Sequence, residues 1–147
     1  MNEEDKQLLL KDLCGRLPYG VICEDMEGKT RPLFGITPTQ HLIVTLDNAT
    51  DGTSGLKFCT IDCVKPYLRP MSSITDKELI EFLGIRGKNL NSEELRTFRE
   101  GETAIVSILP SYSRHIDWLN RNHFDYRGLI PKGLAIAVTK ENNPYKE

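Results

Sequence analysis

The stretch from Ser113 to Gly133 concentrates the side chains of this chain that could bind a ligand. It contains the only Trp, two of the three His residues and an adjacent Tyr–Arg pair. Aromatic rings stack on other planar rings, and a guanidinium group donates forked hydrogen bonds to a phosphate or a carboxylate. We therefore expect Trp118, His123, Tyr126 and Arg127 to line a pocket for a planar, anionic small molecule.

The same side chains also have a purely structural interpretation. One helical face would be formed by His115, Trp118, Leu119 and Asn122, which are spaced i, i+3, i+4 and i+7. In that case Trp118 would pack in the core, and Arg127 would pair with a nearby carboxylate. Asp125 would cap the short turn at residues 126–130. The sequence alone leaves both interpretations open.

A second aromatic and cationic patch is predicted by two segments in which a Tyr lies beside a Pro. They are RLPYG at residues 16–20 and KPYLRP at residues 65–70. Proline restricts the backbone and so lowers the ordering cost of binding. The members of this patch would be Arg16, Tyr19, Tyr67 and Arg69. The structural alternative is that each segment is a rigid, packed turn.

Templates for nucleophilic catalysis fit the sequence poorly. The candidates for a Ser/His/Asp triad are Ser111 or Ser113, His115 and Asp117. These residues would lie on one helix at spacings that do not converge, and the G-x-S-x-G turn that presents a nucleophile is missing. The candidates for a Cys/His pair are Cys14 or Cys63 with His41 or His123, and no local signature supports them. We therefore expect a binding protein rather than an enzyme, with no cofactor.

A metal site is the main catalytic alternative. The spacing H-x-D occurs twice, at His115–Asp117 and at His123–Asp125. Such pairs occur in metal-dependent phosphoesterases, so a phosphodiesterase acting on a cyclic nucleotide is a rival hypothesis. The four cysteines contain no C-x2-C knuckle of structural zinc. We therefore expect reduced thiols that act as small buried side chains, and no bound metal.

Composition and charge place the chain among ordinary globular domains. With 147 residues and 39% apolar residues it can form one domain with a real core, which we expect at residues 1–139 with a frayed tail at 140–147. The net charge of −2 disfavours broad nucleic-acid binding, which depends on neutralising phosphates. The acidic start does not resemble a signal peptide, and no apolar run has membrane-spanning length. We expect a cytoplasmic protein that does not bind membranes.

Hydrophobic periodicity and turn residues predict an α+β fold. It would contain an N-terminal helix, a small antiparallel curled sheet or barrel of about four strands, and a helical half with a closing C-terminal strand. Helices are expected at residues 5–13, from Thr75, at 92–99 and from Ser111 or Ser113 to Asn122. Strands are expected at residues 21–24, 31–36, 41–46, 56–64 and 134–138. Residues 47–55 and 85–91 should be loops, 65–70 should run extended across the surface, and 103–109 could be strand or helix.

Three blocks of the sequence resemble an uncharacterised family of small proteins from anaerobic gut bacteria, their phages and mobile elements. The blocks are LCGRLPYGV at residues 13–21, KPYLRPMSS with ITDKE at 65–78, and DWLNRNHFDYRGLIPKGLAI at 117–136. The family carries no established chemistry, so the resemblance transfers no catalytic residue. It implies a setting, namely an accessory protein of a phage or mobile element in the bacterial cytosol.

That setting and the residue types together give a leading hypothesis and two rivals. The leading hypothesis is a non-enzymatic anti-defence sponge that sequesters a nucleotide-derived immune signal, and a homo-oligomer is compatible with this role. The first rival is the metal-dependent phosphodiesterase. The second is a small barrel that binds a protein partner through the strands at residues 21–64.

Overall fold

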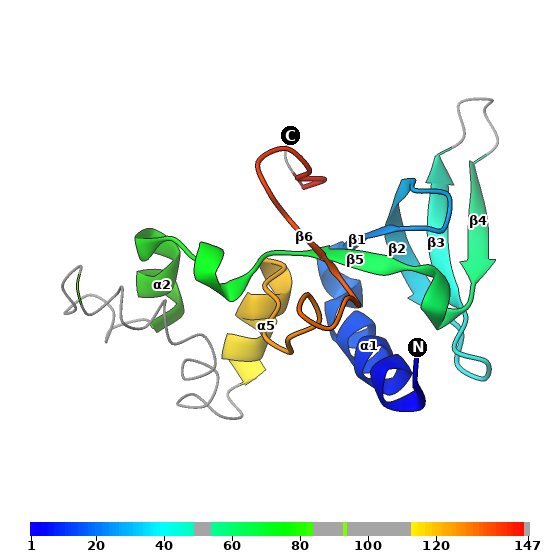
Figure 1. Cartoon of the computed structure of the whole chain (residues 1–147), viewed down its shortest axis with the longest axis horizontal. Helices are drawn as coiled ribbons and strands as arrows, with labels where there is room; N and C mark the ends of the chain where they lie inside the picture. Colours follow the sequence, from blue (N-terminus) through cyan, green and yellow to red (C-terminus); the bar gives the residue numbers. More distant parts are fainter. Residues whose placement is uncertain (49–53, 84–92, 94–112, 146–147) are drawn as a thin grey trace.

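The structure is a computed structural model, and it describes residues 1–48, 54–83, 93 and 113–145. Within these residues the chain forms an open six-stranded sheet, a long N-terminal helix that packs against it, and two further helices at the far end from β4 (Figure 1). The α+β class predicted from the sequence is therefore confirmed.

Helix α1 (Glu3–Arg16) begins where a cap residue and three acids favour a helix start. The Asn2 side chain accepts a hydrogen bond from the Asp5 N–H at 2.8 Å, and Glu3, Glu4 and Asp5 occupy the first turn. The predicted helix at residues 5–13 is confirmed and is longer at both ends. Its buried face consists of Leu9, Asp12, Leu13 and Arg16.

The sheet has the strand order β4-β3-β2-β1-β5-β6. Its strands are β1 (Ile22–Glu24), β2 (Thr30–Ile36), β3 (Ile43–Asn48), β4 (Ser54–Cys59), β5 (Lys65–Leu68) and β6 (Ile136–Ala137). The first four form an antiparallel meander, and β5 returns after a short 3-10 turn at Ile61–Cys63 to pair with β1. The sheet therefore has more than the four strands predicted, and it is not closed.

The predicted closing strand at residues 134–138 is only partly present. β6 contains two residues, and it pairs in parallel with β5 through Tyr67↔Ile136 and Leu68↔Ala137. A parallel pair requires a long crossover, and here the helical half of the chain supplies it.

Two other expectations for the sheet were wrong, and a third is met only in part. A proline at position 32 suggests that its strand lies on a sheet edge or begins there. Pro32 is the third residue of β2, which lies inside the sheet. Leu33 donates toward β1 at the Val21 carbonyl, so the Pro32 nitrogen points to the other side, where the pairing with β3 ends at Leu33. The strand expected at 56–64 ends at Cys59, and its side chains Leu56 and Phe58 are exposed.

The segment at residues 65–70 was expected to cross the surface. It instead forms β5, and Pro66, Tyr67 and Leu68 are buried between the neighbouring strands. It does connect the sheet to the helical half, as predicted. Of the predicted loop at 47–55, residues 47–48 and 54–55 belong to β3 and β4, and residues 49–53 lie outside the described part.

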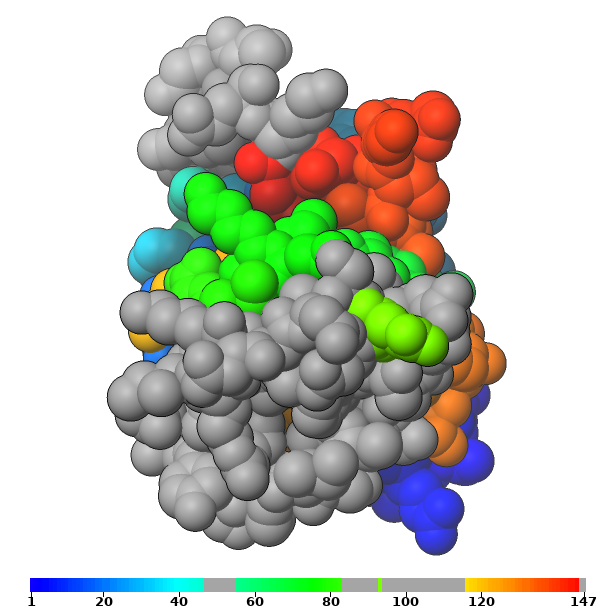
Figure 2. Space-filling view, turned by 90° about the vertical axis from the view of Figure 1, so that its left-hand side faces the viewer, coloured from blue at the N-terminus to red at the C-terminus, as the bar shows by residue number. Residues whose placement is uncertain are grey.

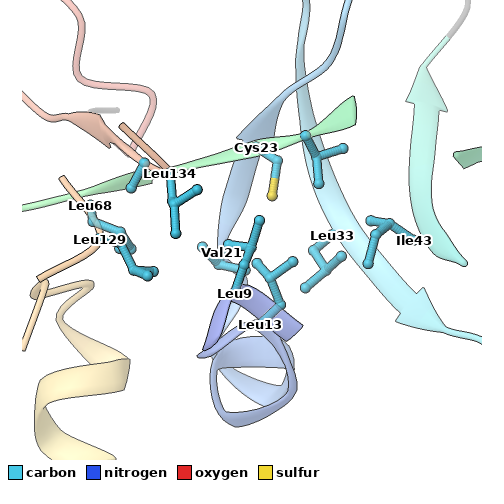
Figure 3. Packing of buried hydrophobic residues seen from close by; sticks show 11 residues of the cluster. Leu9, Leu13, Val21, Cys23, Leu33, Ile43, Leu68, Leu129 and Leu134 are labelled. Carbon is cyan, nitrogen blue, oxygen red and sulfur yellow. The ribbon is translucent and has the colours of Figure 1, made fainter. Parts of the chain in front are cut away.

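The main core lies between α1 and the sheet. Figure 3 shows Leu9 and Leu13 of the helix pointing toward Val21, which precedes β1, and toward Leu33 and Ile43 on the strands. Leu68, Leu129 and Leu134 extend this cluster toward the C-terminal half. Burial of this kind is the largest favourable term in folding, so it fixes the position of α1 on the sheet.

The helical half contains a second apolar cluster. Helix α2 (Asp76–Leu83) begins with the predicted capping box, because Thr75 and Glu78 exchange side-chain-to-backbone hydrogen bonds of 3.1 Å. Helix α5 (Ser113–Arg121) starts at one of the two predicted positions. The second cluster consists of Met71, Ile74, Leu79, Phe82, Trp118, Leu119 and Phe124.

Several predictions fall outside the described residues. They are the loop at 85–91, the helix at 92–99, the segment at 103–109 and a helix start at Ser111. The predicted frayed tail is described up to residue 145, and it carries hydrogen bonds to the rest of the chain. None of the helices in the described ranges has the length and apolar character that crossing a membrane requires.

Candidate functional site

A buried cluster of two arginines around one carboxylate joins α1 to the segment that follows α5. We call it the buried arginine cluster, and its members are Asp12, Arg16, Asn120, Tyr126 and Arg127. The Asp12 Oδ2 lies 2.7 Å from the Arg16 Nε, and its Oδ1 lies 3.3 Å from the Arg127 Nε. The side chains of Asp12 and Arg16 are fully buried, whereas 18% of the Arg127 side chain is exposed. One carboxylate therefore serves two guanidinium groups.

Local structure places these side chains together. Asp12 and Arg16 are one turn apart on α1, so they face the same way. Arg16 Nη2 donates to the carbonyl of Phe124 at 2.5 Å. The chain leaves α5 through His123, whose φ of 63° is left-handed and lets the backbone turn sharply toward α1.

Asp125 holds the next turn in position. Its carboxylate accepts hydrogen bonds from the backbone N–H groups of Leu129 at 2.8 Å and Ile130 at 2.9 Å. This is the capping role that the sequence indicated, and it orients Arg127 toward Asp12.

Electrostatics leave the cluster with an unbalanced positive charge. Arg16 Nη1 has no hydrogen-bond partner among the described residues. Arg127 Nε and Asp12 Oδ1 lie 3.3 Å apart, but their contact is too poorly aligned to count as a hydrogen bond, so these two atoms are unsatisfied as well. Both guanidinium groups lie over the Tyr126 ring, at 5.3 Å for Arg16 and 4.9 Å for Arg127. The Tyr126 hydroxyl accepts from Arg127 at 3.0 Å and donates to Asn120 at 2.9 Å. Burial raises the Tyr126 pKa against the lowering effect of the two arginines.

His123 lies next to this cluster and is covered by an aromatic ring. Its ring stacks on Tyr145 with a centroid distance of 3.7 Å and an interplanar angle of 9°. Its Nδ1 is buried and has no partner among the described residues. Burial, together with the positive charges of Arg16 and Arg69, lowers the His123 pKa to about 4. The imidazole is therefore neutral at physiological pH.

Four other predicted site residues are engaged elsewhere. Trp118 is a core residue, since its ring lies between Phe82 and Phe124 at 5.3 and 5.7 Å and its Nε1–H donates to Glu81 at 3.1 Å. The Tyr67 hydroxyl donates to Glu24 at 2.7 Å, and burial raises its pKa to about 12.

Arg69 has its guanidinium fork filled by the Glu78 carboxylate, at 2.6 and 2.8 Å, over the Phe124 ring. The hydrogen bond from Arg69 is the main cause of the lowered pKa of Glu78. Tyr19 lies under a different arginine, Arg121, at 5.7 Å.

The two predicted patches are thus regrouped by the fold. Arg16, from one patch, joins Tyr126 and Arg127 from the other, with His123 beside them. Trp118, Tyr67 and Arg69 stabilise the core and its rim. The sequence analysis missed Asp12, Asn120 and Tyr145. For Asp12 a signal was present, because it shares the spacing of the buried leucines of α1.

The metal hypothesis gains no support from the described residues, among which no three His, Cys, Asp or Glu side chains could hold an ion together. Both oxygens of Asp125 are occupied by backbone N–H groups, and the side chain of His115 lies outside the described part. The cysteines are free, as expected, but only Cys23 is buried, whereas Cys59 and Cys63 are half-buried and Cys14 is exposed. Burial raises the Cys23 pKa to about 12, which makes it a poor nucleophile.

Two hollows on the described surface lie away from the predicted site residues. One of about 350 Å³ lies between the start of α1, the turn at Gln40 and His41, and the 3-10 turn after β4. The other, of about 140 Å³, lies between the β1–β2 turn and β4.

Comparison of the chain with protein-family models, with curated proteins and with solved structures finds no match. The resemblance of the three sequence blocks to proteins of gut bacteria and their phages therefore stays a prediction. What the site can bind is therefore inferred only from its side chains and their contacts.

Replacing Asp12 by Asn should strongly destabilise the fold. The change leaves two guanidinium groups without a counter-charge in the interior, and breaking a buried pair in this way costs about 3–5 kcal/mol. The free energy of unfolding in urea measures the effect. The matched control is Asp5→Asn, which removes a surface pair with Lys132 at 3.7 Å and should change stability by less than about 1 kcal/mol. Equal losses in the two variants would contradict the central role of Asp12.

His123 should make the protein less stable as the pH falls. Its pKa is about 4 in the folded chain, against 6.5 for an unperturbed histidine side chain. Between these values the unfolded chain binds a proton that the folded chain excludes, so the unfolding free energy decreases by up to about 1.4 kcal/mol per pH unit.

His123→Asn should flatten this slope between pH 6.5 and 4 while keeping the backbone, because Asn tolerates positive φ. His41→Asn is a matched control, since His41 also has positive φ, at 51°, and is exposed. Urea unfolding at several pH values distinguishes the two variants. A slope unchanged in His123→Asn would show that other groups cause it.

Proposed function

We propose that the chain is a non-enzymatic binding protein that takes up a small, planar anion of the nucleotide type at the buried arginine cluster. One observation carries the proposal: two guanidinium groups share a single carboxylate in the interior, Arg16 Nη1 has no hydrogen-bond partner among the described residues, and Arg127 Nε has only the poorly aligned Asp12 Oδ1 at 3.3 Å.

An anionic ligand would supply both things that the cluster lacks, a negative charge and well-placed hydrogen-bond acceptors. A phosphate or carboxylate group supplies the missing negative charge and accepts forked hydrogen bonds from guanidinium groups. Leaving a buried donor without an acceptor costs about 1–3 kcal/mol, which an anionic ligand would recover. Arg127 is the point of access, because it is the partly exposed member of the pair.

The planar part of the ligand is inferred from the neighbouring rings. The Tyr126 ring lies under both arginines, and the His123 ring beside them is stacked on Tyr145, so an aromatic ring is already bound at this place by stacking. Ring stacking is worth about 1–3 kcal/mol per base in nucleic-acid complexes. Binding of this kind needs neither a nucleophile nor a metal. It suits a protein that sequesters a nucleotide-derived signal, which is the role suggested by the resemblance to phage and mobile-element proteins.

Arg127→Gln should weaken binding of adenosine monophosphate by about tenfold to a hundredfold, because a hydrogen bond to a charged group is worth about 1.5–3 kcal/mol. Isothermal titration calorimetry measures the affinity. Arg121→Gln is the matched control, since Arg121 lies on the surface over Tyr19 and should leave the affinity unchanged.

The fate of the nucleotide separates sequestration from hydrolysis. Heat denaturation of the complex should release intact nucleotide, with or without EDTA. If a cleaved product appears and EDTA prevents it, the phosphodiesterase hypothesis holds instead. If Arg127→Gln and Arg121→Gln bind equally well, the buried arginine cluster is structural.

A second candidate function is protein binding through the strands, and a specific observation favours it. Phe34, Leu56 and Phe58 are 60%, 44% and 59% exposed on the strands β2 and β4. The pairs Val44↔Phe58 and Leu46↔Leu56 place apolar side chains opposite one another on one face of the sheet. Exposed apolar patches of this kind mark interaction surfaces. We take a second copy of the chain as the partner, because purified protein alone is enough to test it.

Phe58→Ser should therefore reduce self-association without affecting the fold. Sedimentation velocity over a range of concentrations should show an oligomer for the unchanged chain and a weaker one for the variant. The exposed position predicts a change in stability within about 0.5 kcal/mol. A monomer at every concentration would contradict a self-associating surface.

A further inference from the structure

The segment after β6 folds back onto the sheet and ends beside the candidate site. Val138 N–H donates to the Leu68 carbonyl, and Thr139 and Asn142 then close a tight polar turn through reciprocal hydrogen bonds. Figure 1 shows this red segment passing β5 and turning back above it, and in the view of Figure 2 the red residues lie directly above the green ones. We call residues 139–145 the C-terminal strap.

The hydroxyl of Tyr145 takes the place of a backbone hydrogen bond between β1 and β5. The pairs Cys23↔Pro66 and Glu24↔Lys65 set the register of β1 and β5, so Ile22 and Tyr67 would be the next pair. Instead, Ile22 N–H donates to the Tyr145 hydroxyl at 3.0 Å, and that hydroxyl donates to the Tyr67 carbonyl at 2.7 Å. The two strands are therefore separated at this point by a side chain from the strap.

The ring of Tyr145 also lies beside the buried arginine cluster. It stacks on His123, and the charges of Arg16 and Asp12 both act on its hydroxyl, whose pKa is raised chiefly by burial. The slot that holds the ring therefore has three recognition elements. They are a flat imidazole face, a backbone donor at Ile22 and a backbone acceptor at Tyr67.

We propose that Tyr145 occupies the place of the ligand's ring, and that the C-terminal strap leaves when a nucleobase-like ring binds. This inference rests on the proposed function, and it names the ring class of the ligand. A phenol hydroxyl satisfies Ile22 and Tyr67 because one oxygen both accepts and donates. A purine edge with an adjacent acceptor and N–H donor, such as that of adenine, satisfies the same two groups while stacking on His123. The phosphate would then reach toward Arg127 and Arg16.

When the strap competes with the ligand, the apparent affinity is the intrinsic affinity multiplied by the fraction of molecules in which the slot is open. Removing the Tyr145 ring should therefore strengthen binding of a ligand that needs the slot. It should not strengthen binding of a ligand that needs only the arginines. This difference separates an occluding strap from a structural latch.

The test compares inorganic phosphate, adenosine and adenosine monophosphate on the full chain by calorimetry. Tyr145→Ala should bind adenosine monophosphate and adenosine about tenfold more tightly than the unchanged chain, with phosphate affinity the same. Tyr145→Phe keeps the ring and loses the bridge, so it should gain about threefold. Equal or weaker nucleotide binding by both variants would overturn the strap.

Because Tyr145→Ala could unfold the chain, a measurement on the unchanged protein accompanies it. Saturating adenosine monophosphate should abolish the NMR cross-relaxation between the His123 and Tyr145 rings, and its persistence at saturation would overturn the inference. If nucleotide and phosphate binding depend on Arg127 but not on Tyr145, only the strap fails. If neither ligand responds to Arg127→Gln, the proposed anion site fails, and a tighter adenosine complex of Tyr145→Ala would still support the ring slot.

Discussion

The carboxylate of Asp12, held between two guanidinium groups in the interior, is the interaction on which the arrangement of this protein depends. Removing these charges from water is expensive, and their mutual attraction repays that only when geometry and hydrogen bonding are good. Here Arg16 is also fixed by the Phe124 carbonyl, and Arg127 by the Tyr126 hydroxyl. The cluster therefore ties α1, which packs on the sheet, to the turn that follows α5. The two apolar clusters are joined through it.

Local signals in the sequence were sufficient for the helices of the described residues. Asn2 with the acids after it and the Thr75–Glu78 capping box each act within a few residues, so these starts could be predicted, and the start of α5 was narrowed to Ser111 or Ser113. The sheet was predicted less well because its pairing is decided elsewhere in the chain. β6 is defined by its partner β5 rather than by its own two residues, and Pro32 is tolerated inside the sheet only because the β3 register ends beside it.

The candidate site, like the sheet, was predicted only in part, because it too depends on contacts between distant residues. Tyr and Arg side chains pack in cores as readily as they bind ligands, and only their partners tell the roles apart. Arg69 has a carboxylate of its own in Glu78, whereas Arg16 and Arg127 share one. The spacing of Leu9, Asp12, Leu13 and Arg16 already put a charged pair on the buried face of α1. The position of Tyr145 could not be predicted, because it bonds to a residue 123 positions earlier.

The bond from Arg16 to the Phe124 carbonyl spans 108 positions of the chain. Closing so long a loop costs conformational entropy and slows folding, and the hydrogen bond that offsets this cost forms only when both residues have been synthesised. During synthesis, which proceeds from the N-terminus, Asp12 and Arg16 can pair with each other on the first helix, but Arg16 reaches the Phe124 carbonyl only after the segment following α5 has left the ribosome. The leucines of the helix can pack on the early strands before then, so we expect the ionic closure to follow the formation of the meander.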